Sequence, residues 1–473
     1  MSKVLTTRTK IICTIGPATA SIEKIELLIR AGMNAARLNF SHGTHDQHLQ
    51  YIKNIRAASA KCGLTIPIIA DLGGPKLRIG LVEKEFYVNP HDTLIITTED
   101  VPGTPTKIGT TYKNLPHDVK KGDAILIDDG YISLTVSSVK GNEVHCIVDN
   151  GGVVRSRKGI NLPGVSISSP TITDKDLKDI DFACKQNIDL LALSFVRSHK
   201  DIEQLRTILK QKNSQKPIIA KIEKSEAIED IDQIIAHSDI VMIARGDLGV
   251  ELPTEEVPVL QKKIIEKCLK ASTPVVTATQ MLESMVENSL PTRAEASDVA
   301  NAVFDGTDAV MLSAETSIGA HPEEAVRMMK KIITRSEQDC VPSTDLFSST
   351  FRTDQFVIDL SKAACAIAQE TNASAIFAVT KTGRTARHLA RYRVHTPVFA
   401  FTEHIQTLNL LQLVWGVNGY LMQNLEETDM TLQKVKKFAH EKGFIEHKDI
   451  IVFVAGIPLK TSTEVNMIKL DRV

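Results

Sequence analysis

The chain has 473 residues, 42% of them hydrophobic, which is enough for two or three domains with large cores. Its net charge of −1 and its 4% aromatic content predict no binding to nucleic acid or to an anionic membrane. There is no membrane-spanning run or signal-peptide core, and the seven scattered cysteines include no CxxC pair. We therefore expect a cytoplasmic protein without disulfides.

Eight segments combine a β-branched, apolar run with polar residues at its carboxyl end. They are residues 10–16, 35–40, 67–72, 190–195, 217–223, 239–248, 273–280 and 308–315. Amphipathic helical patterns separate most of them, such as 22–32 after the capping residue Ser21 and 173–186 with Thr173 as its cap. Eight such units predict an α/β protein with a (β/α)8 TIM barrel, whose site lies at the carboxyl ends of its strands.

The helical period is lost between residues 74 and 166, where short strands and turns replace it. So long an interruption predicts a domain of its own, and we expect a small β-barrel inserted into the TIM barrel. Gly74-Pro75 and Pro163-Gly164 flank it as two hinges, which favours a lid over a passive insertion. The barrel domain is then expected at 1–73 and 167–341.

A polar segment, 341–355, follows a predicted helix at 324–340 and is typical of a linker. From residue 355 to 473, helices alternate with five further strands. We expect a separate C-terminal α/β domain there.

The segment from Lys216 to Pro253 has the most informative polar residues. Lys221 and Glu223 alternate with Ile222 and so share one face of a strand, and the next strand ends in Arg245-Gly246-Asp247. A cation and two carboxylates around one point suit a magnesium site. A surface cluster of salt bridges is the alternative, although charges at the ends of buried strands are costly unless they are paired.

Other strands contribute further polar residues at the same end of the predicted barrel. They are Arg37, Asn39, Ser41, His42, Asp71, Arg78, Thr279, Ser313 and Glu315. Carboxylates for a metal together with Lys and Arg are what phosphoryl transfer requires. Neither a GxxxxGK[ST] loop nor a protein-kinase glycine loop is present, so the nucleotide is bound in another way.

Long strings of the sequence resemble pyruvate kinases, in order and over essentially the whole chain. They are ICTIGPAT, MNAARLNFSHGTH, KKGDAILIDDG, KGINLPG, AKIE, ARGDLGVELP, ATQMLESM, PTRAEASDVANAV and MLSAET. The resemblance implies phosphoryl transfer from phosphoenolpyruvate to ADP and protonation of the resulting enolate to pyruvate. It also implies a homotetramer.

The resemblance also implies roles for single residues. Glu223 and Asp247 would bind Mg²⁺, with Mn²⁺ as an open alternative. Lys221 and Arg37 would stabilise the transferring phosphoryl group. Gly246, Asp247, Thr279 and Ser313 would contact the substrate, with Thr279 near the carbon that is protonated. Asn39, Ser41, His42, Arg78 and Lys158 would line the nucleotide side.

One loop departs from the family pattern. Many pyruvate kinases have DTKGPEIR after the third strand and need potassium, whereas this chain has DLGGPKLR from Asp71 to Arg78. Leu72 lacks a hydroxyl, and Lys76 replaces a carboxylate close to the cation region formed by Asn39, Ser41 and Asp71. A fixed ammonium can supply the charge of a bound cation, which predicts potassium independence; neutral drift on an exposed loop is the alternative.

A second phosphate site is predicted in the C-terminal domain. Thr380, Lys381, Thr382, Gly383, Arg384 and Thr385 follow a strand and open a helix. Such a loop can bind an anion, and the family places the phosphate of an allosteric effector there, covered by the loop near 456–462. We expect a sugar phosphate or AMP; an ordinary capped helix is the alternative.

Two other functions compete with this interpretation. A metal-dependent lyase or aldolase could use Lys221 for a Schiff base, but metal ligands beside it make an imine unnecessary. A metabolite-sensing scaffold would be expected to lack one of Lys221, Glu223 and Asp247, and all three are present.

Overall fold

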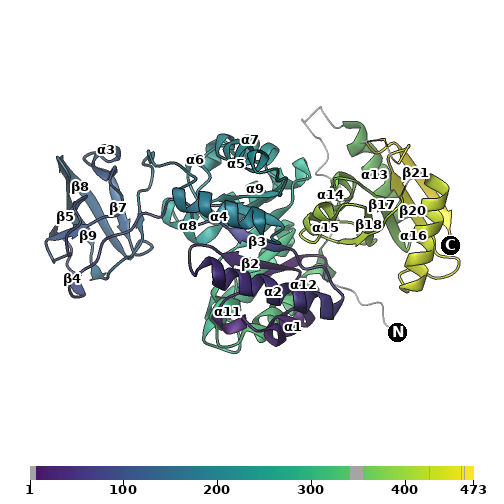
Figure 1. The fold of residues 1–473 in the computed structure, drawn as a ribbon, viewed down its shortest axis with the longest axis horizontal. Coiled ribbons are helices and arrows are strands. Elements are labelled where there is room, and N and C mark those ends of the chain that lie inside the picture. Colours follow the sequence, from purple (N-terminus) through teal and green to yellow (C-terminus); the bar gives the residue numbers. More distant parts are fainter. Residues whose placement is uncertain (1–6, 341–354, 426, 460, 463) are drawn as a thin grey trace.

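The computed structural model describes residues 7–340, 355–425, 427–459, 461–462 and 464–473. Three bodies lie in a row (Figure 1). The strands of the insert, residues 74–166, lie at one end, a barrel lies in the middle, and the C-terminal domain lies at the other end. The linker predicted at 341–355 lies almost entirely outside the described residues.

The central body is a closed barrel of eight parallel strands, which confirms the predicted TIM barrel. Its strands are β1 (Lys10–Thr14), β2 (Ala35–Asn39), β3 (Ile68–Asp71), β12 (Leu190–Leu193), β13 (Ile218–Ile222), β14 (Ile240–Ala244), β15 (Val275–Ala278) and β16 (Ala309–Leu312). Seven of these strands are buried at every position, so their sequences are nearly continuously apolar; only Asn39, at the end of β2, is partly exposed.

Helices surround the barrel and pack their apolar faces against it. Ser21 and Thr173 accept hydrogen bonds from the first turns of α1 and α4, as their sequence positions predict. The helices of this body are α1 (Ile22–Ala31), α2 (His45–Cys62), α4 (Asp174–Lys185), α5 (His199–Gln211), α6 (Glu226–Glu229), α7 (Ile231–His237), α8 (Arg245–Glu251), α9 (Glu256–Ala271), α10 (Arg293–Asp305), α11 (Ala314–Ser317) and α12 (Pro322–Asp339), with short 3-10 turns η1 (Pro17–Thr19) and η2 (Glu283–Val286).

The insert leaves the barrel after β3 and returns before α4. It contains β4 (Phe86–Val88), β5 (Thr93–Thr97), β6 (Lys107–Gly109), α3 (Leu115–Asp118), β7 (Ala124–Ile127), β8 (Ile132–Lys140), β9 (Glu143–Asn150), β10 (Gly152–Val154) and β11 (Ile160–Asn161). The strands form a six-stranded sheet and a two-stranded ribbon around one apolar core. Isolated bridges such as Arg78–Gly159 and Ile79–Thr110 supplement these ladders.

The C-terminal α/β domain has one five-stranded sheet in the order β19-β18-β17-β20-β21, with β21 antiparallel to β20. Separate apolar clusters pack on its two faces. Its elements are α13 (Gln355–Glu370), β17 (Ala375–Val379), α14 (Arg384–Ala390), β18 (Val398–Thr402), α15 (Ile405–Leu411), β19 (Val417–Leu421), α16 (Thr428–Glu441), β20 (Ile450–Ala455) and β21 (Met467–Arg472).

The insert and the C-terminal domain contact opposite ends of the barrel (Figure 1). The insert continues from the carboxyl end of β3. The C-terminal domain contacts residues that precede barrel strands: Arg393 donates to Asp308 (3.1 Å), and Asn409 donates to Asp189 (2.7 Å). None of the helices in the described parts of the chain is long and apolar enough to span a membrane.

Candidate active site

A small cavity of about 70 Å³, called the inner cavity here, lies at the carboxyl ends of the barrel strands. Its walls come from strands β2, β13, β14 and β16 and from the segments that follow β2, β3, β12, β13, β14 and β15. It brings together many of the residues that the sequence singled out: Arg37, Asn39, Ser41, Lys76, Lys221, Glu223, Asp247 and Thr279.

Lys221 is the centre of an ion network beside this cavity. Its Nζ lies 2.8 Å from Glu223 Oε1, 3.2 Å from Asp71 Oδ1 and 2.8 Å from Ser194 Oγ. Arg37 Nε donates to the other oxygen of Asp71 at 2.7 Å, so this aspartate bridges two cations. The predicted shared face of Lys221 and Glu223 is confirmed by their contact.

The pKa values in this network follow from burial and charge. Burial opposes ionisation of Asp71, but the charges of Lys221 and Arg37 outweigh it and lower its pKa. Burial also opposes the charged form of Lys221, yet Asp71 and Glu223 raise its pKa above the ordinary value. Lys221 is therefore a fixed ammonium rather than a free amine.

Glu223 is a carboxylate with capacity for a further cation. Burial, together with the like charges of Asp247 and Asp71, raises its pKa, although Lys221 opposes the shift. One oxygen contacts Lys221, and the other accepts the backbone N–H of Phe195 at 2.7 Å. Glu223 and Asp247 both line the inner cavity, and a divalent cation between them would relieve their repulsion. Among the described residues there is no cluster of three or more His, Cys, Asp or Glu side chains that could bind a metal ion.

Thr279 lies one residue beyond β15 rather than within a strand, with a φ of 67°. Its hydroxyl accepts the backbone N–H of Gly246 at 2.8 Å and donates to the carbonyl of Ala278 at 2.6 Å. Arg245 fixes this segment, because its guanidinium donates to the carbonyl of Thr279 (2.8 Å) and pairs with Asp298 (2.7 Å).

Ser313 also lies one residue beyond its strand, β16, and does not line the inner cavity. Its backbone N–H donates to Glu315 at 2.6 Å, but its Oγ is enclosed and has no partner in the described structure. Glu315 also accepts the N–H of Leu282 at 3.2 Å. This serine is the one predicted substrate residue with an unused hydroxyl.

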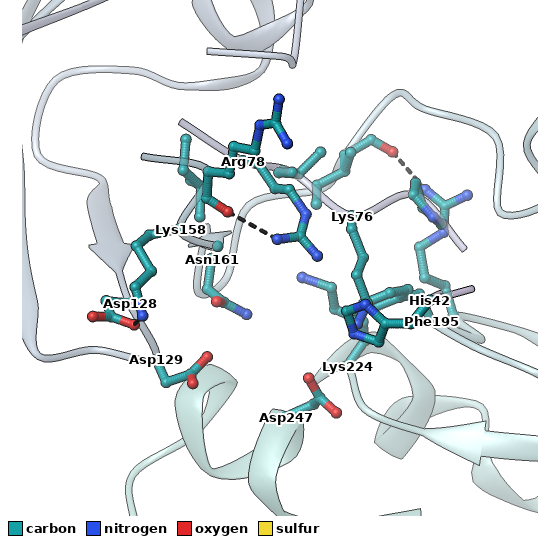
Figure 2. A pocket seen from close by; sticks show the side chains of 17 residues that line it. His42, Lys76, Arg78, Asp128, Asp129, Lys158, Asn161, Phe195, Lys224 and Asp247 are labelled. Atoms are coloured by element: carbon teal, nitrogen blue, oxygen red, sulfur yellow. Dashed lines mark hydrogen bonds and ion pairs between the residues drawn. The ribbon is translucent and has the colours of Figure 1, made fainter. Parts of the chain in front are cut away.

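A larger outer cavity of about 300 Å³ lies between the insert and the barrel. Figure 2 shows Arg78, Asp128, Asp129, Lys158 and Asn161 on the insert side, facing His42, Phe195, Lys224 and Asp247 on the barrel side. Lys158 pairs with Asp128 at 2.9 Å, and Arg78 donates to the carbonyl of Arg157 at 2.8 Å.

Partial burial and the charges of Lys76 and Arg78 lower the pKa of His42, which favours its neutral form. Asp247 and Lys76 line both cavities.

The loop from Asp71 to Arg78 lines both cavities: Pro75 to Arg78 line the outer cavity, and Lys76 lines the inner cavity as well. Gly74 has a φ of 62°, and a Cβ there would lie 2.6 Å from the Phe195 ring. Lys76 follows Pro75, and its backbone N–H donates to the carbonyl of Gly74 at 2.9 Å, whereas its side chain forms no hydrogen bond or ion pair with another described residue. Its side chain extends toward His42 in Figure 2. Leu72 is buried, so the position without a hydroxyl points into the core.

The predicted effector loop lines a separate pocket of about 80 Å³ with Gly456, Ser462 and Glu464. Five of its residues line this pocket: Thr380, Lys381, Thr382, Arg384 and Thr385. Gly383, with a φ of 80°, caps α14, and its N–H donates to Thr380 Oγ1 at 3.0 Å. The covering segment is described except for residues 460 and 463.

Sequence reasoning missed several residues of these cavities. Ser194 and Phe195 follow β12 and hold Lys221 and Glu223, and the rule that polar residues end barrel strands could have found Ser194. Lys224 pairs with buried Glu251 at 2.6 Å, and Asn161 of the insert donates to the same carboxylate at 3.3 Å. No local signal in the sequence indicated that contact between the two bodies.

The fold and the site together define a barrel enzyme equipped to transfer a phosphoryl group. The chain matches the family models "Pyruvate kinase, barrel domain" over residues 6–326 and "Pyruvate kinase, alpha/beta domain" over residues 359–470. It belongs to the pyruvate kinase family, and is therefore a phosphotransferase.

Similar proteins extend this match over nearly the whole chain. A pyruvate kinase of Corynebacterium efficiens is 46% identical over 98% of this chain and 97% of its own length. One from Mycobacterium tuberculosis is 42% identical over 99% of both chains. The crystal structure of a pyruvate kinase from Cryptosporidium parvum has a TM-score of 0.94 and 38% identity, covering 99% of this chain and 96% of that one.

Proposed function

We propose that the inner cavity is where phosphoenolpyruvate transfers its phosphoryl group to ADP. The observation that carries this assignment is the Lys221 ammonium, held by Asp71, Ser194 and Glu223 at 2.8–3.2 Å beside Arg37 and Asp247. The raised pKa of Lys221 argues against a Schiff-base lyase, because a fixed ammonium is not a nucleophile.

In the proposed reaction, Lys221 and Arg37 neutralise charge on the transferring phosphoryl group. The bond from the phosphoryl phosphorus to the enol oxygen breaks as a bond to the terminal phosphate oxygen of ADP forms. Glu223 and Asp247 are the proposed ligands of Mg²⁺, or of Mn²⁺, which when bound supplies Lewis-acid neutralisation. The remaining enolate takes a proton at carbon near Thr279, giving pyruvate, and Ser313 is a further proposed contact of the substrate. Gly246 and Thr279 are the proposed contacts of the carboxylate.

ADP is proposed to bind in the outer cavity. His42, Arg78 and Lys158 line this cavity. Asn39 and Ser41 line the inner cavity and are proposed to face the nucleotide from there. The insert, 74–166, is then a lid that hinges on Gly74-Pro75 and Pro163-Gly164, with the barrel domain at 1–73 and 167–341 and the regulatory domain at 355–473. A neutral His42, favoured by its lowered pKa, avoids adding charge to an already cationic wall.

Potassium independence is part of this proposal. Lys76 lines both cavities and forms no ion pair with a described residue, so its ammonium is available at the position where Asn39, Ser41 and Asp71 would otherwise surround a monovalent cation.

The test is pyruvate formation from phosphoenolpyruvate and ADP with Mg²⁺ in potassium-free buffer, with and without added K⁺. We expect K⁺ to change the rate less than twofold in the wild type. Lys76→Glu should lower the K⁺-free rate by about 10- to 100-fold, corresponding to a charge interaction of roughly 1–3 kcal/mol, and K⁺ should restore it. Activity only with K⁺ in the wild type would retain the enzyme and reject the role of Lys76. No pyruvate in either buffer would reject the reaction.

We further propose that the 380–385 loop binds the phosphate of an allosteric sugar phosphate or of AMP in a cytoplasmic homotetramer. Thr382 is exposed in the loop, and Thr385 lies in the first turn of α14. The double variant Thr382→Ala/Thr385→Ala should lose at least tenfold in effector affinity and keep its maximal rate, as measured by activation curves. Unchanged activation by both effector classes would reject this site.

A further inference from the structure

A second large cleft lies at the opposite end of the barrel from the catalytic site. Its volume is about 830 Å³, and it is bounded by α5, α7 and α9 of the barrel and by α13 and α14 of the C-terminal domain. Ser238-Asp239 directly precedes β14, and Ser272-Thr273 lies one residue before the start of β15; both pairs line the cleft. The cleft is therefore separate from both catalytic cavities.

Basic side chains predominate on its walls. Arg206, Lys267, Lys270, Arg384 and Arg387 line the cleft, against only two aspartates, Asp232 and Asp239.

Both aspartates already have partners. Lys267 contacts Asp232 at 2.6 Å, and Arg206 contacts Asp239 at 3.1 Å. Asp239 also accepts the backbone N–H of Ile218 at 2.9 Å. Neither carboxylate is hydrogen-bonded to Arg387.

Arg387 is the side chain that needs an explanation. Its Nε is enclosed and has no hydrogen-bond partner in the described part of the chain, and its guanidinium forms no ion pair there. Burial lowers the pKa of Arg387, although the attraction of Asp239 opposes the shift, and the repulsion of Arg384 adds a smaller lowering. Enclosing a guanidinium nitrogen without a partner is costly, and an anion in the cleft would remove that cost.

The carboxyl ends of α7 and α9 also face the cleft, and their dipoles attract cations. These dipoles account for the positions of Lys267 and Lys270, which lie near the carboxyl end of α9. They do not explain Arg387, which comes from the other domain, or Arg206, which lies within α5.

We propose that this cleft is a second regulatory site, which binds the phosphate monoester of a small polar metabolite. A phosphate dianion matches the planar donors of Arg387 and would be contacted from the barrel side by Lys267. The volume leaves room for the rest of a metabolite beside its phosphate. Arg384 lines both sites, so occupancy of one site changes the charge seen by the other.

The experiment uses the full-length Thr382→Ala/Thr385→Ala protein, in which the loop site is disabled. Glycerol 3-phosphate and AMP are titrated by calorimetry, with phosphoenolpyruvate present to fill the catalytic site. Binding of either ester supports the proposal and distinguishes a small ester from a nucleotide. Binding of neither overturns it.

Variants then assign the binding to the cleft. Adding Arg387→Met should weaken binding at least tenfold, and adding Lys267→Met should weaken it several-fold while leaving pyruvate formation unchanged. Arg327→Met removes a charge from the exposed face of α12 and should leave affinity unaltered. Wild-type affinity in both cleft variants would overturn the assignment. Lys267→Met keeps the test decisive if Arg387→Met does not fold.

Discussion

Single residues beyond the strand ends set the polarity of the catalytic end of the barrel. Ser313 and Thr316 illustrate two different outcomes for a buried hydroxyl in the same short segment. Thr316 donates to the carbonyl of Thr14 at 2.9 Å, whereas the Oγ of Ser313 has no partner among described residues. A hydroxyl that is buried without a partner lowers the stability of the fold, because it loses its hydrogen bonds to water and gains none in return.

Ser313→Ala should therefore leave the free energy of unfolding unchanged or raise it by up to about 1–2 kcal/mol, because no hydrogen bond is lost and a desolvation cost is removed. Thr316→Val, the matched control, should destabilise by roughly 1–2 kcal/mol, because it leaves the carbonyl of Thr14 with one donor fewer. Urea unfolding measures both. A loss above 1 kcal/mol in Ser313→Ala would contradict this view of its hydroxyl.

The same variant tests the proposed substrate contact. If Ser313 binds phosphoenolpyruvate or the water that protonates the enolate, Ser313→Ala should lower kcat/KM by about 5- to 30-fold, the loss of one hydrogen bond of roughly 1–2 kcal/mol. Steady-state rates at varied phosphoenolpyruvate measure it. An unchanged kcat/KM would leave Ser313 without a role in the reaction.

At the scale of elements, the loop after β3 and the segment after β12 support each other. Gly74 and Phe195 both have positive φ values, 62° and 54°, and a side chain at Gly74 would meet the Phe195 ring. Phe195 in turn donates its N–H to Glu223. A substitution at Gly74 would therefore affect Glu223, a proposed metal ligand, by displacing Phe195.

Gly74→Ala should destabilise the protein by about 2–4 kcal/mol, since it adds a steric clash to a left-handed backbone, and should lower kcat at least tenfold by moving Phe195. The other proposed hinge glycine is the matched control. Gly164 has a φ of 68° but open space where a Cβ would lie, so Gly164→Ala should cost only about 1 kcal/mol. Thermal unfolding and kcat measure the difference. Equal effects of the two variants would reject the coupling through Phe195.

The strands and helices could be predicted from the sequence where apolar residues recur with a regular period and polar residues follow the carboxyl end of a strand. All eight barrel strands were predicted, because each is an apolar run buried along nearly its whole length. The backbone geometry of the residues after the strands could not be predicted, because the positive φ values of Phe195 and Thr279 depend on tertiary packing rather than on residue type. Contacts between distant segments, such as Asn161 with Glu251, also lack a periodic signal.

At the scale of the whole molecule, Lys10 joins the barrel to the C-terminal domain. It begins β1, is buried, and donates to the carbonyl of Val417 at the start of β19 at 2.8 Å. Burial lowers its pKa to about 8, although Glu337 and Asp308 oppose the shift. The folded protein thus releases this proton at a lower pH than the unfolded chain, whose lysine has its ordinary pKa of about 10.5.

Between pH 8 and 10.5 the unfolded chain binds more protons at Lys10, so this residue makes stability rise with pH. Below pH 8 the lysine is charged in both the folded and the unfolded state, so it does not change how stability varies with pH. Burial of its charged form still lowers the stability of the folded protein there. Lys10→Met should remove that slope, so the wild type should gain about 2 kcal/mol relative to the variant between pH 7.5 and 10. Urea unfolding of both proteins at the two pH values gives this difference, in which the titration of all other groups cancels. A stability difference that stays constant with pH would mean that Lys10 keeps its ordinary pKa and that the attraction of Glu337 and Asp308 fully offsets its burial.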